Sequence, residues 1–564
     1  MPLKLLKHPS VRVGLVILLL LTVGLSRIDH YGHSSDEYLE IMMVRWNHEF
    51  ITENTPIGGD LRHYGTVFNF LTQFLYEIKI ILLGETERFG SYGDPDWLTY
   101  NATQFKHLAA FKHGFIFIFS MVAYLSVAGI VSRLIGAAYA WIGPVALFFF
   151  PRFWGHSFFN PKDIPFAAML TLGTYMGGYL LEKFTQAEHN PPVKSNNRRA
   201  LGTAYGSAAL YGCLVGLITG VRIGGLFLLG FVLLVHVAIR LPAWLSKKQL
   251  SSIIPQLIGL YGLMVGTWFL TTTIVHPSAW ANPVGWLTET LAYMSNHTWS
   301  GTVLFAGEQI SAISLPWTYL PTWLLITTPL FVSIAIGTGL LFAVLHYKTM
   351  NPHQKALTLL VLLQIAFFPT VAILKQSTLY DGIRQFLFVM PAAAVIATLG
   401  IVWLYQTWLS NQWLNKILSR KTVSLSFLIL SIVIASPTAI DVFHLHPYEY
   451  VYFNRFFGGL PSAQGQYDTD YWGLSMRAGM EWINEVSGRT ANVVSSSQLI
   501  SSAPFADDTM PVISYKEFEQ NGMETPFYYI ARPRWSYHEQ FPDCDVVYSV
   551  VRQTVPLTIV KQCN

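Results

Sequence analysis

The chain has 564 residues, of which 52% are hydrophobic and only 12% are charged. A soluble protein would carry about one-quarter charged residues, so the composition excludes a soluble enzyme and predicts a polytopic membrane protein. The formal net charge of +4 comes from basic residues scattered through loops without a patch, so it gives no sign of nucleic-acid binding, and we expect no nucleic acid as a partner.

The first apolar run predicts an uncleaved membrane span. Lys4, Lys7 and Arg12 precede residues 13–25, and no small-residue cleavage site follows them. We therefore expect a cytoplasmic N-terminus and a long external segment over residues 28–110. Within that segment residues 67–83 form an amphipathic pattern, which predicts an interfacial helix.

Two adjacent acids, Asp36 and Glu37, follow the first span. Ionised side chains at membrane depth are costly, so both are candidate catalytic residues. Ser34 and Glu37 also match the S-x-x-E capping box of a helix start. In that helix Asp36 would point about 100° away from Glu37 and share a face with Glu40. A structural alternative stays open, in which Glu37 caps the helix and Asp36 complements its dipole.

Ten further apolar runs bring the expected number of transmembrane helices to about eleven. They lie near residues 111–132, 134–151, 162–181, 203–220, 223–240, 252–275, 320–346, 357–374, 386–406 and 422–440. Counting spans from a cytoplasmic N-terminus places the basic loop clusters on one side, as the positive-inside rule requires. An odd number of spans predicts an external C-terminus.

Five basic residues fall at the outer ends of spans, where insertion does not favour cations. They are Arg152, Lys162, Arg222, Lys375 and Arg384. A lipid phosphate is the anion that such a set would bind, because Arg offers a fork of donors and Lys a point charge. The alternative is that they pair with Asp163, Asp381 or lipid headgroups.

Two outer loops hold further candidates for contact with an acceptor. In the first, His156 precedes Asn160, which would cap the next helix and leave an anion site beside Lys162. Asp163 would orient an acceptor there or pair with Lys162. In the second, residues 276–317, the loop is long enough to be a structured cover over a cleft, and it supplies Glu308.

Hydropathy drops after residue 445, so we expect two domains, a transmembrane catalytic domain over 1–445 and an external α/β domain over 446–564. Residues 491–496, 526–530 and 545–551 read as strands, and residues 475–486 as a helix. Cys544 and Cys563 could pair if this tail lies in an oxidising compartment. Asp468-Thr469-Asp470 has the form of a D-x-D motif, but so short a match does not predict a metal site, and we predict no cofactor.

Three short sequences accompany the acid pair: residues 160–165 (NPKDIP), 380–384 (YDGIR) and 446–454 (HPYEYVYFN). With an Asp-Glu pair after the first span, the chain resembles the GT-C superfamily of membrane glycosyltransferases, and within it the protein O-mannosyltransferase and aminoarabinose (lipid A) transferase families. The three short sequences resemble those of bacterial members of these families, which implies that the protein lies in the bacterial inner membrane.

The resemblance implies an inverting hexosyl- or pentosyltransferase that takes a sugar from a polyprenyl-phosphate donor to an acceptor hydroxyl at the outer face of the membrane. Asp36 would then be the general base, with Glu37 beside it, and Arg384 a ligand of the donor phosphate. From the charge argument Lys162, Arg222 and Arg152 would also bind that phosphate, and Tyr380 joins the acceptor candidates. A lipid, a glycan and a protein hydroxyl all remain open as the acceptor.

A flippase or transporter of a lipid-linked sugar is the main alternative function. It would use the same outer cations but would also need charged or broken helices near the midplane of the membrane. The predicted spans carry few internal charges, which favours the enzyme.

Overall fold

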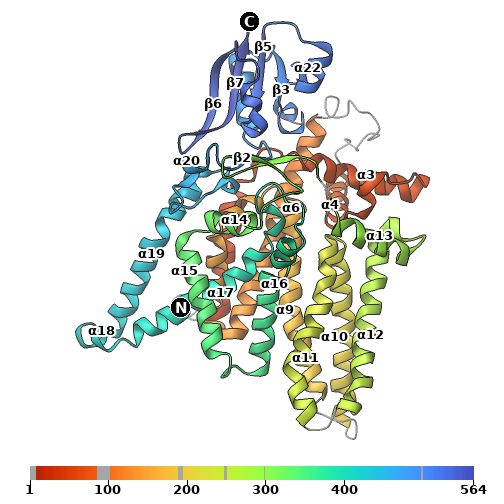
Figure 1. Cartoon of the computed structure of the whole chain (residues 1–564), viewed down its shortest axis with the longest axis vertical. Helices are drawn as coiled ribbons and strands as arrows, with labels where there is room; N and C mark the ends of the chain where they lie inside the picture. The colour runs from red at the N-terminus through yellow and green to blue at the C-terminus, as the bar shows by residue number, and fades with distance from the viewer. Residues whose placement is uncertain (1–7, 85–101, 189–194, 247–249, 298, 497–498) are drawn as a thin grey trace.

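The computed structural model describes residues 8–84, 102–188, 195–246, 250–297, 299–496 and 499–564, and most of it is helical (Figure 1). The helices before the sheet domain are α2 (Pro9–Leu25), α3 (Glu37–Glu53), α4 (Val67–Leu83), α6 (Ala102–Ile135), α7 (Ile142–Phe148), α8 (Pro151–His156), α9 (Asp163–Glu188), α10 (Ser195–Thr219), α11 (Phe227–Ser246), α12 (Leu250–Val275), α13 (Pro283–Ser295), α14 (Tyr319–Thr327), α15 (Leu330–His346), α16 (Pro352–Leu374), α17 (Val389–Leu409), α18 (Gln412–Ile417), α19 (Arg420–Leu445) and α20 (Gly459–Ala463).

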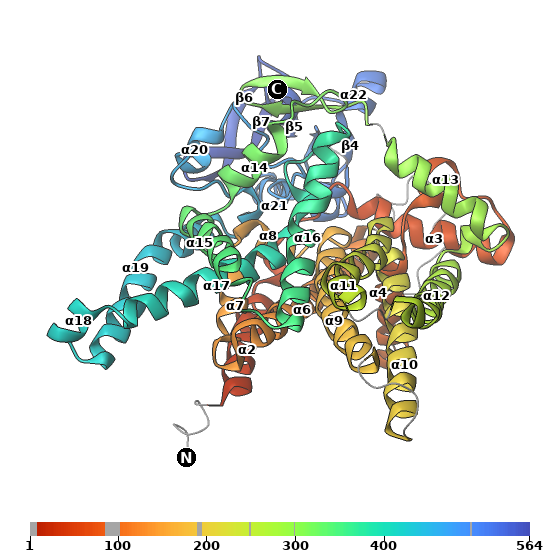
Figure 2. The ribbon, with the colours of Figure 1, turned by 60° about the horizontal axis from the view of Figure 1, so that its bottom comes forward.

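Nine helices among the described residues are long and apolar enough to cross a membrane, or ten if a bent pair counts as one span. The nine are α2, α6, α9, α10, α11, α12, α16, α17 and α19, and the bent pair is α14 with α15, which meet at 112°. The chain is thus an integral, multi-pass membrane protein, as its composition predicts. Helices α18 and α19 diverge from the other helices in both views (Figures 1 and 2).

The count falls short of the expected eleven because two apolar runs are interrupted. Residues 134–151 do not form one long helix, since Gly136 adopts φ 101° and is followed by the seven-residue α7. Seven residues rise only about 10 Å, too little to cross a membrane. The run at 320–346 breaks at Pro329, because the preceding Thr328 is extended, at φ −96° and ψ 128°, as residues before proline prefer.

Loops from both halves of the chain meet at one end of the helices, which we call the site end. There Arg222, after α10, binds Asp163 at the start of α9. At the opposite end Glu188, in the last turn of α9, binds Arg240 of α11. Residues 136–162 therefore carry the chain from the opposite end of α6 back to the site end, although they contain no long helix.

The segment after α2 folds into the helices that the sequence predicts. Helix α4 covers the expected residues 67–83, and α3 starts at Glu37. The backbone N–H of Ser34 donates to Glu37 Oε1 at 2.9 Å, which is one of the two hydrogen bonds of the expected capping box. The other is not formed, because the Ser34 hydroxyl has no hydrogen-bond partner among the described residues and Asp36 is the residue that precedes the helix. The acid pair is thereby fixed at the first turn of α3.

A small α/β domain stands at the site end (Figure 1). Its five-stranded sheet has the order β4-β3-β5-β7-β6; β3 runs parallel to β4 and β5, whereas β7 is antiparallel to β5 and β6. Its elements are α21 (Met476–Val486), β3 (Asn492–Ser495), β4 (Val512–Ser514), α22 (Tyr515–Asn521), β5 (Phe527–Ala531), β6 (Asp545–Arg552) and β7 (Val555–Cys563). The three expected strands and the expected helix are confirmed, while β4 and β7 were not predicted. Cys544 and Cys563 form a disulfide.

The core of this domain begins later than the expected boundary at residue 446. Tyr450 and Trp472 are buried in the same apolar cluster as the membrane helices, whereas Met476 opens a separate cluster with the sheet. The loop at 276–317 is structured, as expected, by α13 and by a hairpin of β1 (Thr302–Phe305) and β2 (Glu308–Ser311). Residues 446–475 and this hairpin therefore lie between the sheet and the membrane helices.

Candidate active site

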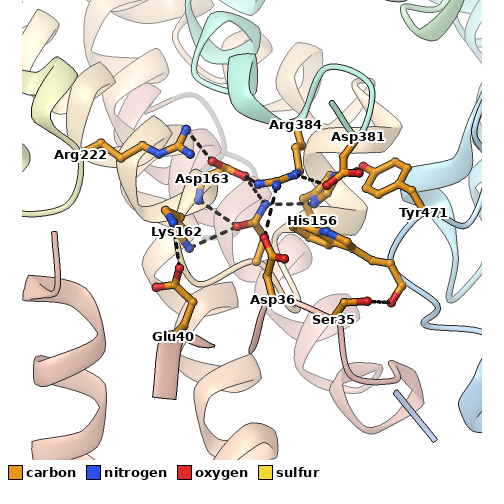
Figure 3. A network of polar contacts seen from close by, with 12 residues as sticks. Ser35, Asp36, Glu40, His156, Lys162, Asp163, Arg222, Asp381, Arg384 and Tyr471 are labelled. Carbon is orange, nitrogen blue, oxygen red and sulfur yellow. Dashed lines mark hydrogen bonds and ion pairs between the residues drawn. The ribbon is translucent and has the colours of Figure 1, made fainter. Parts of the chain in front are cut away.

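Arg384 stands at the centre of a network of ion pairs at the site end (Figure 3). Its side chain is only 4% exposed, and its three nitrogens each meet a different carboxylate. Nε lies 2.9 Å from Asp381 Oδ2, Nη1 lies 3.4 Å from Asp163 Oδ2, and Nη2 lies 3.3 Å from Asp36 Oδ2. Burial alone would lower the pKa of Arg384, but these carboxylates, Asp36 first, raise it well above its usual value. The guanidinium is therefore a fixed positive charge.

Two of the three carboxylates have a second cation. Arg222 Nη1 lies 2.8 Å from Asp163 Oδ1, and Arg534 Nη2 lies 2.8 Å from Asp381 Oδ1. Both acids are buried, at 2% and 5% exposure, as paired charges usually are. Asp36 differs on both counts, because it is 35% exposed and, in the part of the chain that the structure describes, forms an ion pair with Arg384 alone. It is thus the accessible carboxylate of the three.

Asp36 also has an unusual acidity. Although its side chain is partly exposed, the surrounding protein removes much of the water around the carboxylate and so raises its pKa above the ordinary aspartate value, against the opposing charge of Arg384. A carboxylate with a raised pKa is a stronger base than a free one.

A second ion pair lies one helical turn further along α3. Glu40 Oε1 is 3.1 Å from Lys162 Nζ, and Glu40 Oε2 accepts a hydrogen bond from Asn69 at 2.6 Å. Lys162 Nζ also lies 4.1 Å from the centre of the Tyr64 ring. Asp36 and Glu40 thus share the site face of α3, as the helical spacing predicts. Lys162, which is 15% exposed, is one of the charges that act on Asp36, whereas Arg222, which is 23% exposed, joins the network through Asp163.

Local backbone structure positions these side chains. Asn160 Oδ1 accepts hydrogen bonds from the backbone N–H of Lys162 at 3.2 Å and of Asp163 at 2.9 Å, so it caps α9 as the sequence predicts. Before α17 the chain turns through two residues in the left-handed region, Asp381 at φ 59° and Gly382 at φ 64°. The turn points the carboxylate of Asp381 at the guanidinium that follows it.

The five outer cations differ in their partners. Arg222 and Arg384 pair with the expected aspartates, Lys162 pairs with another acid, and Arg152 and Lys375 have no ion pair among the described residues. Arg222 pairs with Asp163, and Arg384 pairs with Asp163 and Asp381, as the structural alternative describes. The other pairing that was left open, of Lys162 with Asp163, does not form. Lys162 instead reaches Glu40, because the acid on α3 lies opposite it and Asp163 is already bound by two arginines.

Arg152 and Lys375 lie apart from the network. Arg152 is 1% exposed, packs over the rings of Trp323 and Phe453, and donates from Nε to the backbone oxygen of Tyr452 at 3.1 Å. Burial lowers its pKa to about 10. Its role in phosphate binding stays a prediction, as does any role for Lys375, which is exposed at the end of α16.

Glu37 faces away from Arg384. Its Oε2 lies 3.0 Å from Nε2 of buried His113, on α6. Burial would raise the pKa of Glu37, but His113 and neighbouring groups hold it below the usual value. These contacts match the structural alternative, since consecutive residues of a helix point about 100° apart. A catalytic role for Glu37 stays a prediction.

Of the four expected acceptor residues, Asp163, His156 and Tyr380 lie in or beside the network, and Glu308 does not. His156 is buried, and its Nε2 lies 2.9 Å from the Tyr471 hydroxyl; burial lowers its pKa to about 3, so it is neutral. The ring of half-buried Tyr380 lies 4.9 Å from the Arg384 guanidinium, within the network. Glu308 is exposed on β2, and no ion pair joins it to another described residue.

Among the residues that the structure describes, no group of three or more His, Cys, Asp or Glu side chains is placed to hold a metal ion. The D-x-D sequence has another local role. Asp470 accepts hydrogen bonds from the backbone N–H of Gly473 at 2.7 Å and of Ser475 at 3.1 Å, so it shapes the loop before α21.

No protein-family model matches the chain, and no curated protein matches it. Among solved structures, it is similar to ArnT from Cupriavidus metallidurans bound to undecaprenyl phosphate, at 13% identity and a TM-score of 0.44, over 97% of each chain. It is also similar to the oligosaccharyltransferase of Archaeoglobus fulgidus in the apo form, at 12% identity and a TM-score of 0.48, over 93% of this chain and 70% of that one. These neighbours are GT-C membrane glycosyltransferases, the superfamily that the sequence resemblance names.

Sequence reasoning missed two members of the network. Glu40 was placed on the face of Asp36 but was given no partner, and Arg534 was passed over. The only signal for Arg534 is the sequence Arg532-Pro533-Arg534-Trp535, where two arginines stand beside an aromatic residue in the tail.

Proposed function

We propose that the chain is an inverting glycosyltransferase that moves a sugar from a polyprenyl-phosphate donor to an acceptor hydroxyl, with Asp36 as general base. One observation carries the proposal: the most exposed carboxylate of the network, Asp36, contacts a fixed guanidinium, and two partly exposed cations, Lys162 and Arg222, belong to the same network. A base and a set of anion-binding groups are the two parts that this reaction needs.

The reaction balances on these groups. Asp36 takes the proton of the acceptor hydroxyl as its oxygen bonds to the anomeric carbon of the sugar. The bond from that carbon to the phosphate oxygen breaks, and the electron pair leaves with polyprenyl phosphate. Attack on the face opposite the phosphate inverts the anomeric centre. Lys162, Arg222 and the Nη2 edge of Arg384 would stabilise the charge that develops on the leaving phosphate, so the step does not require a metal ion.

The setting of the site supports a lipid-linked donor. The network lies at one end of the apolar spans, where an isoprenoid chain can lie in the bilayer while its phosphate meets the cations. The disulfide between Cys544 and Cys563 supports an oxidising, external location of the C-terminal domain, as expected at the outer face of a bacterial inner membrane. The sugar would be a hexose or a pentose, and the acceptor a lipid, a glycan or a protein hydroxyl.

The test uses purified full-length protein in liposomes with a short-chain polyprenyl-phosphate sugar and pooled acceptors from cell envelopes. Release of polyprenyl phosphate together with a glycosylated acceptor would support the proposal. Movement of intact donor across the bilayer without release would reject it in favour of a flippase.

A further inference from the structure

Arg534, in the C-terminal domain, forms an ion pair with a member of the network, Asp381. This side chain is 6% exposed, and its Nη2 lies 2.8 Å from Asp381 Oδ1. The other oxygen of the same carboxylate lies 2.9 Å from Arg384 Nε, and Arg384 in turn contacts Asp36. Arg534, Asp381, Arg384 and Asp36 thus form a continuous series of contacts in which positive and negative side chains alternate.

The position of Arg534 is fixed by several contacts. Its Nη1 donates to the backbone oxygen of Tyr471 at 2.9 Å, and its guanidinium lies 4.3 Å from the centre of the Trp535 ring. Trp535 Nε1 donates to the backbone oxygen of Thr302 at 3.0 Å, which fastens this loop to the β1–β2 hairpin. Trp535 and Ser536 both adopt left-handed backbone angles, at φ 55° and 56°, so the loop has a specific, constrained shape.

We propose that Arg534 is a positioning residue that neutralises Asp381 and thereby leaves the charge of Arg384 available to Asp36. Without Arg534, Asp381 would have Arg384 as its remaining ion-pair partner, and an uncompensated negative charge would face Asp36. The C-terminal domain would then be part of the active site. The catalytic meaning of this inference rests on the proposed function, but the charge coupling does not.

The size of the coupling follows from the groups around Asp36. The titratable and charged side chains that face it are Arg384, Asp381 and Tyr380 before α17, Lys162 and Asp163 at the start of α9, and Glu40 on α3. A unit charge removed from a point on the order of 10 Å away, at an effective dielectric constant of about 20, shifts a pKa by roughly one pH unit. Because the lost charge is positive, the pKa of Asp36 rises.

The experiment measures how far Asp36 is protonated, independently of turnover. A carbodiimide reacts with protonated carboxyl groups, so labelling of Asp36 in the full-length protein is followed by mass spectrometry as a function of pH. In Arg534→Gln the midpoint is expected about one pH unit above that of the wild type, and in Arg534→Lys near the wild-type value. Arg552→Gln is the matched control. Arg552 also fastens the domain, from Nε and Nη2 to the backbone oxygen of His446 at 3.2 and 3.0 Å, but these bonds reach no carboxylate.

An unchanged midpoint in Arg534→Gln, or an equal shift in Arg552→Gln, would overturn the proposal. If Arg534→Gln does not fold, Asp381→Asn carries the test, because removing the acid must move the midpoint down; an unmoved midpoint overturns the proposal as well. If the midpoint of Asp36 shifts in Arg534→Gln but the wild-type protein shows no transfer activity, the positioning role is supported and the proposed function is rejected. If the wild type transfers sugar but the midpoint does not shift in Arg534→Gln, the proposed function is supported and the positioning role is rejected.

Discussion

Arg222→Gln tests the donor-phosphate site at its most exposed cation. Arg222 is 23% exposed, and among the described residues its one ion pair joins Nη1 to Asp163. The remaining donors of its guanidinium are available for a phosphate. Asp163 keeps Arg384 and the amide of Asn160 as partners after the substitution, so the fold should survive.

The expected loss is in donor affinity. A hydrogen bond to a charged group contributes about 1.5–3 kcal/mol, and 1.4 kcal/mol is a factor of ten in an equilibrium constant. The dissociation constant for the donor should therefore rise about 10- to 150-fold. Because Arg222 shares its charge with Asp163, we expect the lower part of this range. The variant should also lose part of the salt dependence of donor binding.

Binding of a short-chain polyprenyl phosphate to the purified protein measures this effect. The matched control is Arg133→Gln. Arg133 is likewise partly exposed, at 34%, and is likewise paired with an acid, Glu182 at 2.9 Å, but it lies at the opposite end of the helices. Equal affinity in the wild type and Arg222→Gln, or an equal loss in both variants, would refute the assignment of Arg222 to the phosphate.

Three further predictions concern stability and pH. Arg384→Gln leaves three carboxylates without their common partner and should destabilise the protein by roughly 3–5 kcal/mol, seen as a lower thermal midpoint in detergent; an unchanged midpoint would contradict the central place of this arginine. Asp36 must be ionised to act as a base and its pKa is raised, so kcat/KM should fall as pH drops through that raised pKa; an acid limb only below pH ~4, the region of a free aspartate, would contradict this. Glu188→Gln breaks buried pairs with His236 at 2.9 Å and Arg240 at 2.7 Å, far from the site, and should lower stability by about 3–5 kcal/mol while the kcat of the folded fraction is kept; a loss of kcat would count against a purely structural role.

Features that depend on local sequence were predictable. Membrane spans follow from continuous apolar runs, and the cap of α9 follows from Asn160 before a proline. One continuous helix over 134–151 was wrongly expected, although this segment does return the chain to the site end, because hydropathy does not register Gly136 or the proline at 151 as interruptions. The same holds for the bend at Pro329, where the backbone rule for residues before proline outweighs the apolar pattern.

The contacts of the site depend on tertiary structure and could be predicted only in part. Charge placement at the ends of spans brought out Arg384, Lys162 and Arg222, because unfavourable cations need a partner. It did not show which acid each one meets, since a pairing such as Lys162 with Glu40 depends on how α3 packs against α9. The contact of Arg534 with Asp381 joins two domains, and no local pattern predicts it.

Transfer by Asp36→Asn is the measurement that tests the central claim most directly. The substitution removes one negative charge while Arg384 keeps Asp163 and Asp381, so the protein should fold and bind polyprenyl phosphate at least as tightly as the wild type. General-base catalysis contributes about 10²–10⁴-fold, so the rate of single-turnover transfer should fall by that factor. The control is Asp29→Asn, the same change at an exposed acid near the end of α2, which should transfer at the wild-type rate. Transfer by Asp36→Asn within a few-fold of the wild type would contradict the account.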